Sequence, residues 1–261
     1  MADRPTRTDS GWEPRCHSGF VRFLEAIAEG SKGASLIERE GVVASVAPGS
    51  PERSLFNSVV YESRLALRDS LAEIRETYDA AGVNAWTVWV PEADAQETGP
   101  WLAERGHRLD GRPRAMLLDL GDVPDPEEGL DFTRSLEWPV LCAVNDAAYG
   151  YDEGSFEAGL GRRPDQSFRA YGARHNGWVA GVLASLLHDG ACEITAVATL
   201  PEARGNGIAG RLLHRALADA REKGCEISTL QASEMGKSVY ERLGYRDRGE
   251  LQMWEHRVFP S

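Results

Sequence analysis

The stretch Val197–Gly210, VATLPEARGNGIAG, decides the fold of this protein. A strand-forming run ends at Pro201, and a glycine-rich turn then opens a long helix. Such a turn points free backbone N–H groups outward at a helix N-terminus, where the helix dipole also favours anions. Gly205 and Gly207 let the backbone approach a ligand without an intervening Cβ. Nearby basic residues add positive charge: Arg204, Arg211 and, further along the helix, Arg215. The segment therefore predicts a phosphate-binding loop.

Two other phosphate-binding motifs fit this part of the chain poorly. Gly205-x-Gly207-x-x-Gly210 has the spacing of the dinucleotide fingerprint, but that motif follows its strand directly and begins a series of alternating strands and helices. Here several residues intervene, and only about fifty residues of chain remain. Gly236-Lys237-Ser238 matches the end of a P-loop, but Gln231 stands where that motif requires glycine.

The segment Arg204–Ala209, RGNGIA, resembles the pyrophosphate-binding signature [Q/R]-x-x-G-x-[G/A] of the GNAT superfamily of N-acetyltransferases. The family also carries, after the loop, a Tyr followed shortly by Gly and an aromatic residue, and Tyr240-Glu-Arg-Leu-Gly244-Tyr245 is similar to that ending. The resemblance covers roughly residues 131–261. It implies transfer of an acetyl group from acetyl-CoA to a primary amine of a small molecule or peptide. A non-catalytic acyl-CoA-binding sensor on the same fold is the alternative.

The resemblance implies which residues bind acetyl-CoA, as a cosubstrate and with no metal. In this family the strand before the loop separates from the next strand and pairs with pantetheine through its backbone, and the loop binds pyrophosphate. The implied residues are Val197, Ala198 and Thr199 in the strand and Arg204, Gly205, Asn206, Gly207, Ile208, Ala209 and Gly210 in the loop. Ser233, seven residues before Tyr240, stands where the family often has Asn and is a further candidate contact.

Acyl transfer from a thioester to an amine needs a base, a group that stabilises the oxyanion and a proton for the departing thiolate. By resemblance, a backbone N–H near Thr199 or Val197 polarises the carbonyl and Tyr240 is the general acid. A phenol has a pKa of about 10, close enough to that of a thiol to donate its proton. Alternatively, the Tyr240 ring only packs beneath the helix.

Glu193 is the first candidate for the base, because some histone-type family members carry a base eleven residues before the loop arginine. A partly buried carboxylate there could have a raised pKa. Alternatively, Glu193 is an exposed strand residue. Weaker candidates are Asp146, Asp152, Glu153 and His188. By resemblance, the loop Tyr149–Phe156 sets substrate specificity, and its aromatic and acidic residues suit a cationic or aromatic amine. Alternatively, it is a solvated loop with its aromatic side chains packed beneath it.

The chain of 261 residues is long enough for two domains. Residues 121–131, GDVPDPEEGLD, have the composition of a linker, which predicts domains at 1–125 and 131–261. Aligning Gly106 with Gly244 also superposes Gly111 on Gly249, so the halves look duplicated. Residues 1–120 contain no comparable glycine-rich loop. The N-terminal half is therefore interpreted as a degenerate GNAT-like copy that closes the cleft or forms a homodimer interface.

The expected fold class is α/β (α+β), with two GNAT-like domains that each have a mixed, mostly antiparallel sheet flanked by helices, and with a splayed strand pair in the second. The predicted helices are 19–28, 64–81, one ending near 104, 139–148, 208–222 and 235–243. The predicted strands are 42–47, 55–61, 85–90, 115–120, 167–173, 178–188, 191–199, 225–232 and 250–257.

The charge balance argues against several classes of partner. The 41 acidic and 29 basic residues give a net charge of −12, which disfavours general binding to nucleic acid or to anionic membranes. No apolar run is long enough to cross a bilayer and the first residues have no signal-peptide pattern, so a cytoplasmic location is expected. The four cysteines are widely spaced, which predicts buried reduced thiols.

Overall fold

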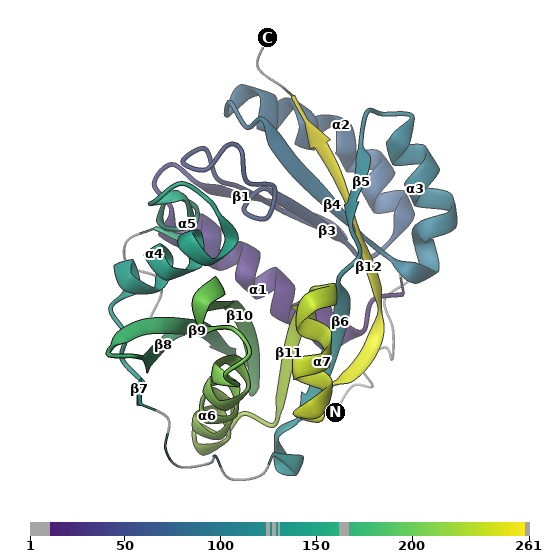
Figure 1. Ribbon diagram of the computed structural model, residues 1–261. Coiled ribbons are helices and arrows are strands. Elements are labelled where there is room, and N and C mark those ends of the chain that lie inside the picture. The colour runs from purple at the N-terminus through teal and green to yellow at the C-terminus, as the bar shows by residue number, and fades with distance from the viewer. Residues whose placement is uncertain (1–10, 124–125, 127–128, 130, 162–166, 259–261) are drawn as a thin grey trace.

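The computed structural model describes residues 11–123, 126, 129, 131–161 and 167–258 (Figure 1). The N-terminal half comprises α1 (Pro14–Gly30), β1 (Ser35–Arg39), β2 (Val42–Val46), β3 (Ser58–Tyr61), α2 (Arg64–Ala80), β4 (Ala85–Pro91), α3 (Ala95–Ala103), β5 (Arg108–Gly111) and β6 (Arg114–Asp119). The C-terminal half comprises β7 (Phe132–Thr133), α4 (Trp138–Tyr149), α5 (Ser155–Leu160), β8 (Phe168–His175), β9 (Trp178–His188), β10 (Ala191–Thr199), α6 (Ile208–Glu222), β11 (Ile227–Ala232), α7 (Glu234–Arg242) and β12 (Arg246–Arg257).

Tight turns connect β8, β9 and β10. Asn176 and Gly177 have φ values of 51° and 86°, and Asp189 and Gly190 have 41° and 73°, as two-residue hairpin turns require. The turns fix the register in which Ala184 lies opposite Ala170 on β8 and opposite Thr195 on β10. This three-stranded unit carries the phosphate loop at the end of β10.

The sheet confirms the expected mixed, mostly antiparallel class. Among the described residues its strand order is β1-β2-β3-β4-β12-β6-β11-β10-β9-β8-β7, with β5 on β12. Two adjacent pairs are parallel, β3 with β4 and β10 with β11, and each is joined by a helix, α2 or α6. These equivalent positions show that the two halves repeat the same arrangement.

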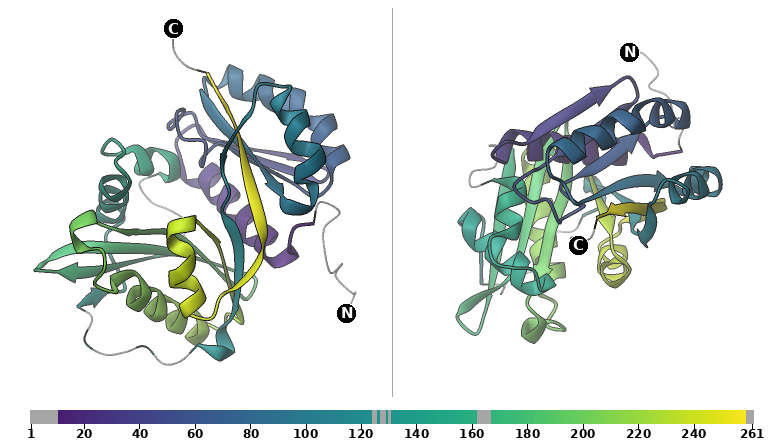
Figure 2. Two further views of the ribbon diagram at one scale, coloured as in Figure 1. Left: turned by 45° about the vertical axis from the view of Figure 1, so that its right-hand side comes forward. Right: turned by 90° about the horizontal axis from the view of Figure 1, so that it is seen from above.

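The two halves exchange strands. β6 of the N-terminal half lies between β11 and the start of β12, with Leu118 opposite Ser228 and Met116 opposite Asp247. β12 then continues into the N-terminal half, where Trp254 lies opposite Val88 of β4. Figures 1 and 2 show β12, in yellow, passing from the side of α7 into the other half. The strands of each half are therefore completed by a strand from the other half, which makes one continuous sheet. The sequence boundary near residue 125 stays a prediction.

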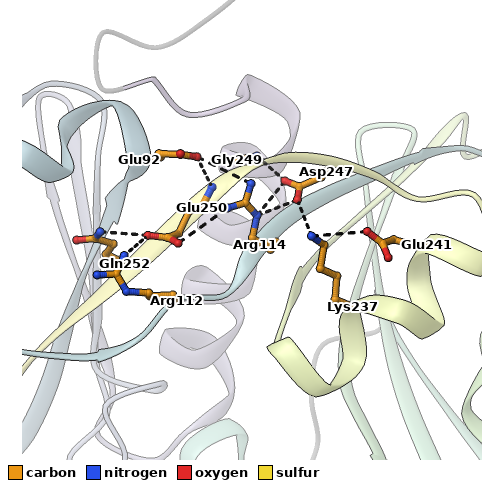
Figure 3. Close-up of polar contacts among 9 residues, drawn as sticks. All are labelled: Glu92, Arg112, Arg114, Lys237, Glu241, Asp247, Gly249, Glu250 and Gln252. Carbon is orange, nitrogen blue, oxygen red and sulfur yellow. Dashed lines mark hydrogen bonds and ion pairs between the residues drawn. The ribbon is translucent and has the colours of Figure 1, made fainter.

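Charged residues hold the point where β6 and β12 cross (Figure 3). Arg114 Nε lies 2.8 Å from Asp247 Oδ2, and Arg112 Nη1 lies 2.6 Å from Glu250 Oε1. Between the two acids the register of β12 against β6 shifts, and Gly249 has a φ of +124° that favours glycine. The ion pairs and the bulge together let one strand serve both halves.

The connection after the last helix of each half is also repeated. Gly106 and Gly244 have φ values of +88° and +97°. His107 N donates to Leu102 O and Tyr245 N donates to Tyr240 O, both at 3.1 Å. The predicted duplication is thus visible in the hydrogen bonding, with Leu102 at the position equivalent to Tyr240.

Helix α1 packs between the halves. Its buried residues include Phe20, Leu24 and Ile27, which share one core with Trp89 of β4 and with Leu186 of β9. The helix contacts β2 in its own half and β10 and β11 in the other. One apolar cluster, the one that contains α1, therefore spans both halves.

The cysteines match a further expectation. Cys16, Cys142, Cys192 and Cys225 are free and buried. Within the described ranges, the structure contains no helix with the length and hydropathy needed to span a bilayer.

Candidate functional site

Strands β10 and β11 separate along part of their length and leave an opening in the sheet. They pair only from Ala191 to Glu193 and then diverge. On the other side of β10, the register with β9 shifts between Thr195 and Ala198, where Ala196 has a φ of +52°. This conformation is strained for a residue with a Cβ and marks a bulge. The bulge takes Ala196 and Val197 out of the ladder and directs their backbone into the opening between the strands.

The phosphate loop opens into a cavity of about 660 Å³. Gly205 and Gly207 have φ values of +80° and +69°, and a Cβ at either position would meet no atom within 4 Å. Gly207 is the N-cap of α6, so N–H groups of the first turn face the same cavity. The predicted binding residues that line it are Val197, Ala198, Thr199, Arg204, Gly205, Gly207, Ile208, Ala209, Gly210 and Ser233.

Three polar residues expected near the phosphate make contacts within the protein instead: Asn206, Arg204 and Arg215. The Asn206 side chain donates to Ala203 O at 3.0 Å and so stabilises the loop from within. Arg204 donates through Nε to Thr199 O at 3.1 Å and through Nη2 to Ala148 O at 2.8 Å, which ties the end of β10 to the end of α4. Arg215 is paired with Asp219 and does not line the cavity.

Tyr240 lies where two cavities meet. It lines both, although only 9% of its surface is exposed. A Cβ at Gly236 would lie 2.9 Å from Tyr240 Cε2, so the ring packs directly on that backbone. Burial, with a smaller contribution from Tyr149, raises the pKa of Tyr240, so its hydroxyl is protonated at neutral pH.

Ser233 and Tyr149 flank the same junction. Ser233 is the N-cap of α7, where its Oγ accepts a hydrogen bond from Gly236 N at 3.3 Å. Tyr149 Oη donates to Val197 O at 2.8 Å. Both residues line both cavities, so together with Tyr240 they surround the passage between them.

The second cavity, of about 1100 Å³, lies between the two halves. The N-terminal half contributes Arg53, Trp89 and Asp110, α4 and the following loop contribute Asn145, Tyr151 and Asp152, β11 contributes Gln231, and β12 contributes Met253 and Glu255. Arg53 is paired with Asp146 at 3.0 Å, and Arg257 with Glu255 at 2.8 Å. We call this space the interdomain cleft.

Glu193 is buried and lines neither cavity, although the next residue, Ile194, lines the interdomain cleft. The alternative that Glu193 is an exposed strand residue is therefore wrong. Only 1% of its surface is exposed. Thr229 Oγ1 donates to Glu193 Oε2, while Oε1 makes no hydrogen bond of normal geometry within the described residues. Burial raises the pKa of the Glu193 carboxyl to about 7, and hydrogen bonding by Thr229 and Gln231 acts in the opposite direction.

The weaker base candidates occupy other places. Asp146 is buried, accepts from Phe156 N and is paired with Arg53, which is a structural role. Asp152 lines the interdomain cleft. Glu153 is exposed, and neither it nor His188 lines either cavity.

Several residues of the interdomain cleft were not found from the sequence, among them Trp89 and Gln231. Trp89 is a buried core residue, yet it also lines the cleft. Gln231 entered only as a mismatch to a P-loop. The available signal was its spacing from Thr229, since residues two apart on a strand project from the same face.

The comparisons with known proteins agree with this geometry. Residues 131–245 match the model of the acetyltransferase (GNAT) family. A GCN5-related N-acetyltransferase from Kribbella flavida has a similar structure, with a TM-score of 0.65 and 18% identity over 92% of this chain and 96% of that one. A GCN5-related N-acetyltransferase from Sphaerobacter thermophilus has a TM-score of 0.60 and 17% identity, over 98% of this chain and 96% of that one.

A tandem arrangement is also seen among similar structures. A tandem GNAT protein from the clavulanic acid biosynthesis pathway has a TM-score of 0.54 and 14% identity, over 94% of this chain and 96% of that one. None of the curated proteins compared with the chain matches its sequence. The loop, the separated strands and the family match agree: residues 131–245 of this chain match the acetyltransferase (GNAT) family, and the fold is that of solved GCN5-related N-acetyltransferases.

Proposed function

We propose that the protein is an acetyl-CoA-dependent N-acetyltransferase that acetylates a primary amine of a small molecule or peptide. The observation that carries the proposal is the position of Tyr240, which borders both the cavity of the phosphate loop and the interdomain cleft. A group at that junction can contact the reacting atoms of two different substrates.

The first cavity suits acetyl-CoA. The open backbone at Gly205 and Gly207 and the N-terminus of α6 offer donors to the pyrophosphate. The bulged segment around Val197 offers backbone groups to pantetheine, and the Tyr149 hydroxyl now bonded to Val197 O would move aside for it. Arg204 supports this wall through its two carbonyl contacts.

The interdomain cleft suits the acceptor amine. In the proposed reaction the amine nitrogen attacks the thioester carbonyl carbon, the C–N bond forms and the C–S bond breaks. The proton lost by the amine passes through water to Glu193, which lies outside the cleft, and Tyr240 supplies a proton to the departing thiolate. Backbone N–H groups near Val197 or Thr199 stabilise the oxyanion. A base with a pKa of about 7 is half ionised at neutral pH, which suits this role.

Calorimetry with acetyl-CoA tests the donor site. Gly207→Trp should weaken binding at least about 100-fold, because the side chain enters the cavity. Gly224→Trp is the matched control: Gly224 also has a positive φ and open space around its Cβ position, but it does not line the cavity. Equal loss of binding in both variants would show that backbone strain, not ligand contact, is responsible.

Release of free thiol over a panel of primary amines tests the reaction. Tyr240→Phe should slow amine-dependent release about 100-fold or more while acetyl-CoA still binds. Tight binding without turnover on any amine would favour an acyl-CoA sensor. If no acyl-CoA binds, the proposal is refuted.

A further inference from the structure

The N-terminal half forms one wall around Glu193. Helix α1 passes over the carboxylate at Gly19, where an added Cβ would lie 2.6 Å from Glu193 Oε2 and 2.7 Å from Thr229 Oγ1. No side chain larger than hydrogen fits there without displacing one of these groups. The backbone of α1 thus presses directly on the carboxylate and its hydrogen-bond donor.

Gln231 lies on the side of Glu193 that faces the cleft. Glu193 is opposite Thr229 on β11, and Gln231 is two residues further on, so its side chain projects from the same face of the strand. Gln231 also lines the interdomain cleft. Gln231 Nε2 and Glu193 Oε1 are both buried and neither makes a hydrogen bond of normal geometry. A buried amide donor and a buried carboxylate acceptor therefore remain available between the base and the acceptor site.

We propose that Gly19 and Gln231 are positioning residues for Glu193, with α1 of the N-terminal half sealing the carboxylate from behind and Gln231 connecting it to the interdomain cleft. The proposal rests on the proposed function, in which Glu193 is the base. It gives the degenerate half a part in catalysis although α1 does not line either cavity.

Among the residues that the structure describes, no ion pair to Glu193 is found, and its pKa is shifted by burial and by hydrogen bonding from Thr229 and Gln231. Burial is the largest cause of the raised pKa of three neighbouring groups, and Glu193 in turn helps to raise it: Cys16 of α1, Cys192 of β10 and Tyr245, which precedes β12. All three groups are therefore neutral near pH 7. Burial and the two hydrogen-bonding side chains therefore dominate the protonation of Glu193. Gln231→Met, which removes the amide at similar volume, should raise the pKa of Glu193.

The pH profile of kcat/KM tests the proposal. Wild type should show a rising limb near pH 7, and Gln231→Met should move it upward by about one pH unit, so that activity falls about tenfold at pH 6 and little at pH 9. Met253→Gln, also lining the cleft, is the matched control and should leave the limb in place. Gly19→Ala should lower kcat about tenfold or more with an unchanged KM for acetyl-CoA.

The outcomes separate this proposal from the proposed function. Persistence of the limb in Glu193→Gln would refute the assignment of the base itself. If Glu193→Gln loses the rising limb but Gln231→Met leaves it in place, Glu193 remains the base and Gln231 does not position it. That result would overturn the inference of this subsection, whatever the effect of Gly19→Ala, and would leave the proposed function intact. Calorimetric binding of acetyl-CoA by each variant confirms that the site is folded.

Discussion

Burial of Glu193 should cost the protein stability at neutral and alkaline pH, and Glu193→Gln should recover it. The carboxyl has an ordinary pKa of 4.5 and a folded-state value of about 7. Between these values the folded state holds a proton that the unfolded state has released, so stability falls as the pH rises and is constant above about pH 7. At about 1.4 kcal/mol for each pH unit, the loss is about 3 kcal/mol.

Glutamine retains the size of the side chain and an oxygen that can accept from Thr229, but it does not ionise. The difference in unfolding free energy between Glu193→Gln and wild type should therefore be about 3 kcal/mol more favourable to the variant at pH 8.5 than at pH 4.5. All other titrating groups contribute to both proteins and cancel in the comparison.

Urea unfolding followed by circular dichroism at the two pH values measures this difference. Thr229→Val is a useful companion, because it removes the donor to Glu193 while leaving the carboxyl in place and should increase the pH dependence. If Glu193→Gln and wild type differ by the same amount at both pH values, the carboxyl is not held in a desolvated site and the reasoning is wrong.

Three further predictions concern the fold. Residues 131–261 alone lack β6 between β11 and β12 and should show no cooperative thermal transition; an intact transition would mean that the exchanged strand is dispensable. Arg114→Ala and Asp247→Ala should be coupled by about 1 kcal/mol in a double-mutant cycle of urea unfolding, and additive effects would contradict a role of this pair at the crossing. Burial, and then His256, lowers the pKa of His107 to about 3, so protonation of the unfolded chain should destabilise the protein as pH falls below 6.5. His107→Phe should reduce the loss between pH 7 and pH 4 by about 3 kcal/mol, and equal losses in both proteins would refute this.

The sequence was most informative where strong periodicity and turn residues coincide. The predicted bounds of β9, β10 and α6 agree with the structure, because glycine turns bracket the strands and an apolar stripe runs through the helix. Helix α1 begins at Pro14, five residues before the predicted start, because Glu13 accepts hydrogen bonds from the N–H groups of Arg15 and Cys16. A glutamate is a less common cap than the short polar residues that signal a helix start.

Short elements were not predicted from local pattern. The strands β1, β5 and β7 and the helix α5 have only two to six residues, too few for a period to show. Two of them are also largely exposed: β1 and β5 present mostly polar side chains. Their pairing is decided by neighbouring strands that are distant in sequence.

The candidate site divides in the same way. The loop around Gly205 and Gly207 and the position of Tyr240 follow from a local motif, so the sequence could indicate them. The burial of Glu193 depends on α1, far away in the chain, and the acceptor cleft depends on the exchange of β6 and β12. Strand partners of similar composition cannot be chosen by local pattern, so this part required the structure.

The exchanged strands also set an order for folding during synthesis. When β4 leaves the ribosome its edge has no partner, because residues 251–257 of β12 are translated more than 150 residues later. β6 must likewise wait for β11 before it joins a sheet. The nascent N-terminal half therefore carries unpaired strand edges until β11 and β12 have been synthesised. Such edges can pair with other chains, so binding by a chaperone during this interval would protect the chain from aggregation.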